Sequence, residues 1–473
     1  MPNQNLLRDT SDRHVQVAIL GGGLAGLILA RKLSASADVM VIERGGSQPG
    51  APGPDCAEGE ASGLPYPFAD TRDFRLGGST SIWAGYCAEF DDLDFAPRDW
   101  VPLTGWPISK SDLAPFRNDA ARLLNLSSID FSPQSIVKNA TKPLPIDLPG
   151  LEVTAWRFGC PQLNILEQWD LQDRSLKNVK IQTRTRVINI QLSMDHSSVD
   201  HVLCLTDSGN TFRLHAGVFV LAMGGLESTR LLLAASTQRP EGVANSSGML
   251  GKCFCEHPHL SVEGFSIRPD HPAALLAGRG LDNQDRPFAI CIGVPEHEQV
   301  ERKILNARAH IYRTPQMDVQ EPPRLGIFLE QCPSLSSELS LSRKQDDAGI
   351  PHLALNWNIN ELDKHSFIQT ARYVCEALEA AGAGSILSRL EPDAIMPDRI
   401  LHSNHQLGTT RMSAERELGI VDADCRSHDH ANLYIIGGSV FPTVGWANPS
   451  YTLALLTLRL ARHLEAELKG VSS

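Results

Sequence analysis

The sequence lacks the long apolar runs and the basic excess that mark two large classes of protein. No uninterrupted apolar stretch reaches the roughly 18 residues of a membrane helix, because Arg459 and Arg462 interrupt the apolar segment "YTLALLTLRLARHL". Lys and Arg total 43 against 55 Asp and Glu, and the net charge of −12 disfavours a phosphate backbone as a partner. We therefore expect neither membrane insertion nor binding to nucleic acid.

Two further absences concern the cellular compartment. The ten cysteines contain no CxxC pair and no regular spacing, a pattern typical of buried thiols in a reducing environment. The N-terminal segment "MPNQNLLRDTSDRHVQVAIL" has neither a basic start nor an apolar core of signal-peptide length. Together they predict a cytoplasmic protein.

One segment, "GKCFCEHPHL", gathers Cys253, Cys255, His257 and His259. Alternation along an extended chain would place all four on one face, which would suit a metal ion. A strand crossing between domains explains the same segment, because cysteine is among the residue types most often buried. We predict no metal site here.

The strongest local pattern is a strand–turn–helix–strand unit between about Val15 and Arg44. Its turn reads Gly21-x-Gly23-x-x-Gly26, where glycines let the backbone turn tightly, approach a pyrophosphate and pack a helix on a strand. Glu43 ends the second strand, 22 residues after Gly21, where it can accept a hydrogen bond from a ribose hydroxyl. This unit predicts dinucleotide binding, with Arg44 beside Glu43, but the spacing does not separate FAD from NAD.

A second glycine loop, "LGGSTSIWAG", places Gly77 and Gly78 beside Ser79 and Thr80. Open backbone N–H groups and hydroxyls of this kind can bind a cofactor, although an ordinary loop has the same composition.

Two C-terminal segments carry the candidate chemistry: "SNHQLGTTRM" with His405, and "GGSVFPTVGWANPSYT" with Asn448, 43 residues downstream. Histidine suits a general base because its unperturbed pKa of about 6.5 leaves much of it neutral. A second polar group can stabilise the charge that develops on a substrate oxygen.

In order and spacing, these motifs resemble the glucose-methanol-choline (GMC) family of FAD-dependent alcohol oxidoreductases over nearly the whole chain. The resemblance implies an α/β fold, with a Rossmann-like FAD-binding domain and an inserted, mostly antiparallel substrate domain, as in p-hydroxybenzoate hydroxylase-like architectures. It implies FAD as cofactor, His405 as base and Asn448 as its hydrogen-bonding partner. It also assigns cofactor contacts to residues in four later segments: Val187, Gly224, Gly438, Ser439 and Pro449.

The predicted division follows from the same patterns. Residues 14–100, 179–258 and 401–470 form the FAD-binding domain, and residues 101–178 form a connecting or cap segment. Residues 259–400 form the substrate domain, with a helix from about Glu361 to Ala380. In one branch of the family, a histidine that can bind FAD covalently precedes the tryptophan of the second glycine loop. Ile82 occupies that position before Trp83, so we expect non-covalent FAD.

The substrate is less clearly indicated. We expect oxidation of a CH–OH group in a sugar, aminosugar or other polyhydroxylated molecule, with electrons passing to oxygen or to a separate acceptor. Trp446 either stacks on a sugar ring or packs in the protein, and Gln406 and Gln331 are weaker candidates for substrate contact. Oxidation of an aromatic or aliphatic alcohol, a redox-neutral lyase reaction, an NAD-linked dehydrogenase and a non-catalytic binding protein remain alternatives.

Overall fold

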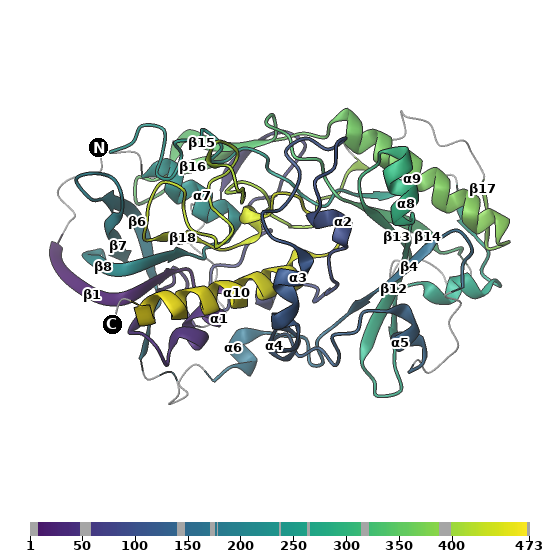
Figure 1. Ribbon diagram of the computed structural model, residues 1–473, viewed down its shortest axis with the longest axis horizontal. Coiled ribbons are helices and arrows are strands. Elements are labelled where there is room, and N and C mark those ends of the chain that lie inside the picture. The colour runs from purple at the N-terminus through teal and green to yellow at the C-terminus, as the bar shows by residue number, and fades with distance from the viewer. Residues whose placement is uncertain are drawn as a thin grey trace.

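The computed structural model describes residues 8–47, 58–139, 147–170, 176, 178–235, 238–262, 265–313, 321–386 and 399–470. Two large sheets dominate it, one toward each end of the molecule (Figure 1). Among the described residues, no helix has both the length and the apolar character needed to span a membrane.

The first sheet contains the predicted strand–helix–strand unit. Its strands run in the order β5-β2-β1-β8-β7-β6, with β18 also beside β8. Strands β1, β2, β5, β8 and β18 pair in parallel, whereas β7 pairs antiparallel with both β6 and β8. The bounds are β1 Arg8–Leu20, β2 Val39–Ile42, β5 Val179–Gln182, β6 Thr185–Leu192, β7 Val199–Thr206, β8 Asn210–Leu221 and β18 Leu433–Ile435.

Burial explains why β1 reads as a continuous apolar run. Val17 to Leu20 are fully buried, as expected for a central parallel strand covered on both faces. Helices α1 (Leu24–Leu33) and α10 (Pro449–Gly470) pack against each other beside this sheet, and α7 (Gly224–Ala234) follows β8. The segment that opens the cofactor domain and the one that ends it therefore meet.

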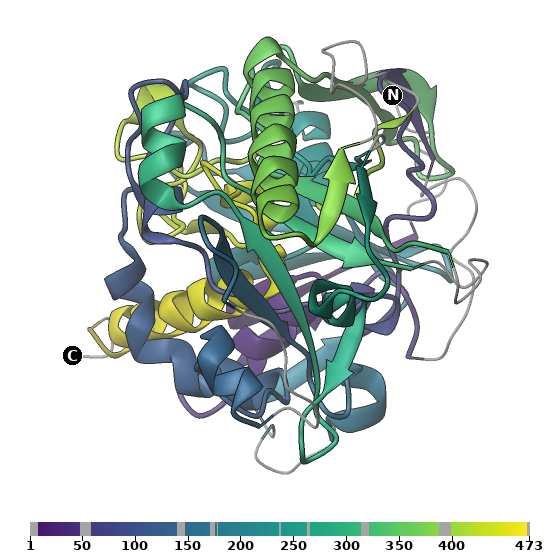
Figure 2. The same ribbon diagram turned by 90° about the vertical axis from the view of Figure 1, so that its right-hand side faces the viewer.

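The second sheet is antiparallel throughout, as predicted for the substrate domain. Its order is β11-β12-β13-β14-β9, and β4 pairs with β12. Helix α9 (Glu361–Ala380) covers one face, seen in Figure 2, and begins at a capping box formed by Asn360 and Asp363. The strands are β4 Glu152–Arg157, β9 His259–Ser261, β11 Arg279–Leu281, β12 Pro287–Gly293, β13 Ala307–Tyr312 and β14 Arg324–Leu329.

Two segments depart from the predicted domain division. Strand β4 comes from the segment expected to connect the domains or to form a cap, yet it joins the second sheet. Strands β15 (Glu338–Gln345) and β16 (Pro351–Trp357), expected within the substrate domain, form a third sheet with β3 (Gly59–Gly63) and pack against α7. Their apolar residues share a buried cluster with Leu226 of α7. Single-strand patterns do not reveal such long-range partners.

The remaining elements are short. Strands β10 (Phe265–Ile267) and β17 (Gly384–Ile386) pair antiparallel. The other α-helices are α2 Asp92–Phe95, α3 Lys110–Leu113, α4 Arg117–Leu123, α5 Pro133–Val137, α6 Ile165–Gln168 and α8 Glu296–Arg302.

A buried ionic cluster joins the second sheet to the loop that precedes α10. Arg308 of β13, fully buried, donates to Asp91 Oδ2 at 2.7 Å, and Trp446 Nε1 donates to the same oxygen at 3.0 Å. Nearby, Arg98 forms two hydrogen bonds with Glu330, and both side chains are buried. These contacts fix the backbone immediately before Asn448.

Candidate active site

A cavity of about 270 Å³ lies at the carboxyl ends of the parallel strands of the first sheet. Residues from the glycine turn, the end of β2, the second glycine loop, β6, the start of α7 and the C-terminal segments line it. Predicted cofactor residues that line this cavity are Gly21, Gly23, Glu43, Arg44, Gly78, Ser79, Thr80, Val187, Gly224 and Gly438. Segments that lie far apart in the sequence and were predicted to bind the cofactor thus meet at one cavity.

The two glycine loops contact each other closely. Gly77 N–H donates to Gly22 O at 2.7 Å, and a Cβ on Gly78 would lie 3.0 Å from Gly23 Cα. Gly21 has φ +108°, and a Cβ there would lie 2.5 Å from Ala222 O. A Cβ on Gly26 would overlap Gly21 O, so this glycine lets α1 pack on the turn.

The N-terminus of α1 opens onto this cavity. Gly23 occupies the N-cap position without a side-chain cap, and a Cβ there would meet nothing nearer than Gly78 Cα at 4.0 Å. Uncapped N–H groups and the helix dipole favour an anion at this position. The arrangement fits the pyrophosphate of a dinucleotide.

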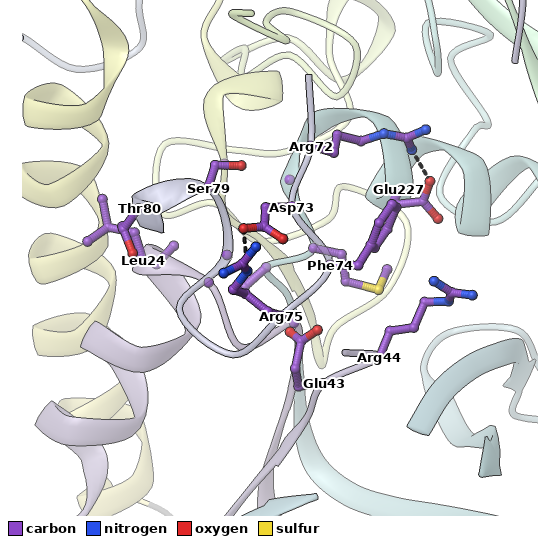
Figure 3. A pocket seen from close by; sticks show the side chains of 18 of the residues that line it. Leu24, Glu43, Arg44, Arg72, Asp73, Phe74, Arg75, Ser79, Thr80 and Glu227 are labelled. Atoms are coloured by element: carbon purple, nitrogen blue, oxygen red, sulfur yellow. Dashed lines mark hydrogen bonds and ion pairs between the residues drawn. The ribbon is translucent and has the colours of Figure 1, made fainter. Parts of the chain in front are cut away.

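Glu43 lies at the other side of the cavity, at the end of β2 (Figure 3). Its carboxylate accepts hydrogen bonds from Gly22 N–H at 2.8 Å and Gly45 N–H at 2.7 Å. Burial raises the pKa of Glu43 to about 7, although these donors act in the opposite direction. Each oxygen keeps a lone pair that a ribose hydroxyl can use.

Residues 72–75 form part of the cavity wall that the sequence did not reveal. Figure 3 shows Arg72 paired with Glu227 of α7, and Arg75 paired with Asp73. The Arg44 guanidinium lies over the Phe74 ring, 5.1 Å from its centroid. This segment falls in an irregular stretch, where no periodic pattern marks the residues that turn inward.

His405 and Asn448 meet beside this cavity. Asn448 Nδ2 lies 3.4 Å from His405 Nε2, and both residues are half-buried. Their neighbours Gln406 and Ser450 line the cavity, which places the pair at its border. Asn448 directly precedes α10, whose N-terminus favours negative charge nearby.

A second histidine, His257, contacts the first. Its Nδ1 lies 2.7 Å from His405 Nδ1, and its Nε2 lies 2.8 Å from Gly445 O and 3.1 Å from Val444 O. Burial lowers the pKa of both histidines, and for His405 the neighbouring His257 lowers it further. Both imidazoles are therefore neutral near pH 7.

Glu256 holds the segment that carries His405. Fully buried, it accepts hydrogen bonds from the backbone N–H groups of His405 at 2.8 Å, His257 at 2.9 Å and Ser403 at 3.1 Å. Burial raises its pKa to about 8 against these donors. From the sequence, the segment that contains Glu256 was interpreted only as a strand crossing between domains.

The other residues of that segment do not form a metal site. Cys253 and Cys255 are buried free thiols, and His259 stacks on Phe328 with ring centroids 4.5 Å apart. Among the described residues, the candidate metal-ligand group is instead Asp200, His201 and His215.

Several other expected residues lie outside the cavity wall. Gly26 packs against Gly21 of the wall, and Gly77 lies next to Ile165 and Leu166. Ser439 accepts a hydrogen bond from Thr410 Oγ1 at 2.7 Å. Pro449 is the first residue of α10. Trp446 is 3% exposed and packs against Trp156 with centroids 5.5 Å apart. Of the two roles weighed for Trp446, the structure shows packing.

Gln331 was expected to contact substrate, and the structure places it elsewhere. It is fully buried, its Oε1 accepts from Glu256 N–H at 2.9 Å and Trp357 Nε1 at 3.0 Å, and its Nε2 donates to Asn358 O. The amide is thus satisfied by protein groups. Gln406, by contrast, lines the cavity and donates to Thr71 O at 3.1 Å.

Comparison with known proteins decides the family. The model of the GMC oxidoreductase family matches residues 333–457, which include His405 and Asn448. Over these residues the chain belongs to the GMC oxidoreductase family. It is 26% identical to a 6'''-hydroxyparomomycin C oxidase of Streptomyces lividus, over 97% of this chain and 93% of that protein.

Other GMC oxidoreductases give the same result. The chain is 23% identical to a paromamine 6'-oxidase of Streptomyces fradiae, over 97% of this chain and 92% of that protein. The crystal structure of a formate oxidase matches with a TM-score of 0.63 and 16% identity, over 98% of this chain and all of that one. As a GMC oxidoreductase the chain is a flavoprotein, and the glycine cradle, Glu43 and the uncapped α1 terminus fit FAD.

Proposed function

We propose that this GMC oxidoreductase oxidises a CH–OH group of a sugar, aminosugar or similar polyhydroxylated molecule to a carbonyl, with FAD held non-covalently. The observation that carries the proposal is the pairing of His405 Nε2 with Asn448 Nδ2 at 3.4 Å, next to the cofactor cavity. Oxidising an alcohol removes a proton from oxygen and a hydride from carbon. FAD, when bound, supplies the hydride acceptor.

His405 takes the hydroxyl proton at Nε2. Its lowered pKa keeps the ring neutral, and Glu256 holds its backbone in place. General-base assistance of this kind contributes about 10²–10⁴-fold in rate. Without it, the proton would have to leave to water.

Asn448 donates a hydrogen bond to the substrate oxygen as negative charge develops there. The N-terminus of α10, which begins at the next residue, adds a favourable field at the same place. The two groups thus act on one oxygen, one accepting its proton and the other stabilising what remains.

Two features support the finer parts of the proposal. Ile82, where a covalently linking histidine would stand, is a 51% exposed hydrocarbon side chain that cannot form such a bond. Two relatives that match 97% of the chain are a 6'''-hydroxyparomomycin C oxidase and a paromamine 6'-oxidase, which favours a polyhydroxylated substrate.

The test is an anaerobic screen of alcohols against the purified holoprotein, following bleaching of oxidised-flavin absorbance. The panel pairs sugars, aminosugars and cyclitols with aromatic and aliphatic alcohols. We expect reduction by a polyhydroxylated member, and a rate about 10²–10⁴-fold lower in His405→Ala at equal FAD content. Full reduction rates in His405→Ala would refute the role of the base.

The alternatives give different results in the same screen. A lyase would consume substrate without bleaching the flavin, and an NAD-linked dehydrogenase would lack flavin absorbance. Bleaching by an aromatic or aliphatic alcohol alone would retain the oxidation and replace the substrate class.

A further inference from the structure

His257 is the buried group in direct contact with the proposed base, and its surroundings determine where its protons lie. Its Nε2 lies 2.8 Å from Gly445 O and 3.1 Å from Val444 O, and the side chain is 1% exposed. Carbonyl oxygens only accept hydrogen bonds, and a buried polar atom needs a partner. Nε2 of His257 therefore carries a hydrogen.

The opposite nitrogen then has no hydrogen in the neutral ring. His257 Nδ1 and His405 Nδ1 are 2.7 Å apart, a distance that requires one proton between them. Because His257 Nδ1 offers a lone pair, His405 Nδ1 must donate. The reverse assignment would make His257 an imidazolium, whose charge would be buried in a ring with 1% exposure.

We propose that His257 is a positioning residue that fixes the tautomer of His405, with the hydrogen on Nδ1 and a bare Nε2 facing the substrate. The inference rests on the proposed function, since a bare Nε2 is what a general base needs. His257 also remains a hydrogen-bond acceptor for His405 after His405 has taken the substrate proton. The Nδ1–H of protonated His405 still donates to His257, as a stronger, charge-assisted hydrogen bond.

The arrangement is held from both sides. Val444 and Gly445 belong to the loop that leads to Asn448, and the buried ionic cluster anchors this loop through Trp446. Glu256, next to His257, holds the backbone of His405. The base, its tautomer-setting partner and Asn448 are thus parts of one hydrogen-bonded unit.

Two matched substitutions separate the two nitrogens of His257. In His257→Asn, the amide oxygen is separated from Cβ by as many bonds as Nδ1 is in histidine. It can therefore accept a hydrogen bond from His405 Nδ1. In His257→Gln, the amide nitrogen is separated from Cβ by as many bonds as Nε2 is in histidine. It can therefore donate to the Gly445 and Val444 carbonyls, but no acceptor remains for His405 Nδ1. We expect His257→Asn to keep the rate of anaerobic flavin reduction within about tenfold, and His257→Gln to lose about 10²-fold, with FAD content unchanged.

A direct measurement of the tautomer does not depend on turnover. In ¹⁵N-histidine NMR spectra of the holoprotein, with His405→Ala to assign the signals, we expect hydrogen on Nδ1 of His405 in the wild type and His257→Asn, but not in His257→Gln. A wild-type His405 protonated at Nε2, or wild-type reduction rates in His257→Gln, would overturn the proposal. If His257→Gln fails to fold, the wild-type spectrum alone decides.

The two proposals fail differently. If no alcohol reduces the wild-type flavin, the proposed function is wrong, yet the NMR spectrum still tests the tautomer. If alcohols reduce the flavin and the spectrum shows hydrogen on Nε2, the function stands and the role of His257 falls.

Discussion

At the scale of single residues, the chemistry depends on how far the pKa of His405 lies below its ordinary value. Burial and the neighbouring His257 lower it well below 6.5, so the base stays neutral as the pH falls through that range. We therefore expect the rate of flavin reduction by substrate to change less than about twofold between pH 8 and pH 6. The measurement is the anaerobic reduction rate across this range.

Asn448→Asp should alter this profile. A carboxylate beside Nε2 favours the imidazolium and raises the pKa of His405, so the base is lost as the pH falls. We expect the reduction rate of this variant to drop about tenfold from pH 8 to pH 6. Asn448→Ala is the matched control, slower at every pH with the profile unmoved; superimposable profiles for Asp and Ala would contradict the assignment.

Candidate residues in locally complete motifs could be singled out from the sequence, and residues that depend on distant partners could not. His405, Asn448 and the glycine turn lie in motifs that are complete within a few residues, and the structure places them in or beside one cavity. His257 approaches His405 from 148 positions away, which no local pattern encodes. Gln331 looked available for substrate because its burial under Trp357 depends on tertiary packing.

At the scale of elements, the start of α1 combines two glycines with opposite demands. A Cβ at Gly23 meets no protein atom nearer than 4.0 Å, whereas a Cβ at Gly26 overlaps Gly21 O. We expect Gly23→Ala to leave the melting temperature of the apoprotein unchanged and to weaken FAD binding at least about tenfold, because the methyl crowds the pyrophosphate. Gly26→Ala should lower the apoprotein melting temperature itself.

Thermal melts of both apoproteins and FAD titrations by flavin fluorescence test this pair. Equal FAD affinity in Gly23→Ala and the wild type would show that the α1 terminus does not face the cofactor.

Helices and strands, like single residues, could be predicted from the sequence where their signals are local. Helix α9 was placed within its observed bounds because its capping box and apolar stripe are local, while the pairing of β3 with β16 was not foreseen.

At the scale of the whole molecule, buried charges lie between the second sheet and the loops packed against it. Arg98 and Glu330 are almost entirely buried, and Glu330 also accepts from Asn306 N–H at 3.0 Å. Removing one member of such a pair typically costs about 3–5 kcal/mol, because the other charge stays buried alone. We expect Arg98→Met to lower the melting temperature more than Arg98→Met/Glu330→Gln, in which Gln keeps an acceptor for Asn306.

Differential scanning fluorimetry of the two variants at equal FAD saturation measures this order. A double variant that melts below the single one would show that Glu330 does not depend on Arg98 for its burial.

The general division into a cofactor half and an antiparallel half was predicted from the sequence. The pairing of β4 with β12 and the third sheet of β15, β16 and β3 were not predicted, because strand partners are chosen by tertiary contacts.

The cavity wall begins at Gly21 and ends at Leu453. On the ribosome, a nascent chain therefore carries its first glycine turn long before Gly437, Gly438 and Ser450 have been synthesised to complete the same wall. A chain that stops before Gly437 would therefore lack part of this cavity wall and Asn448 as well.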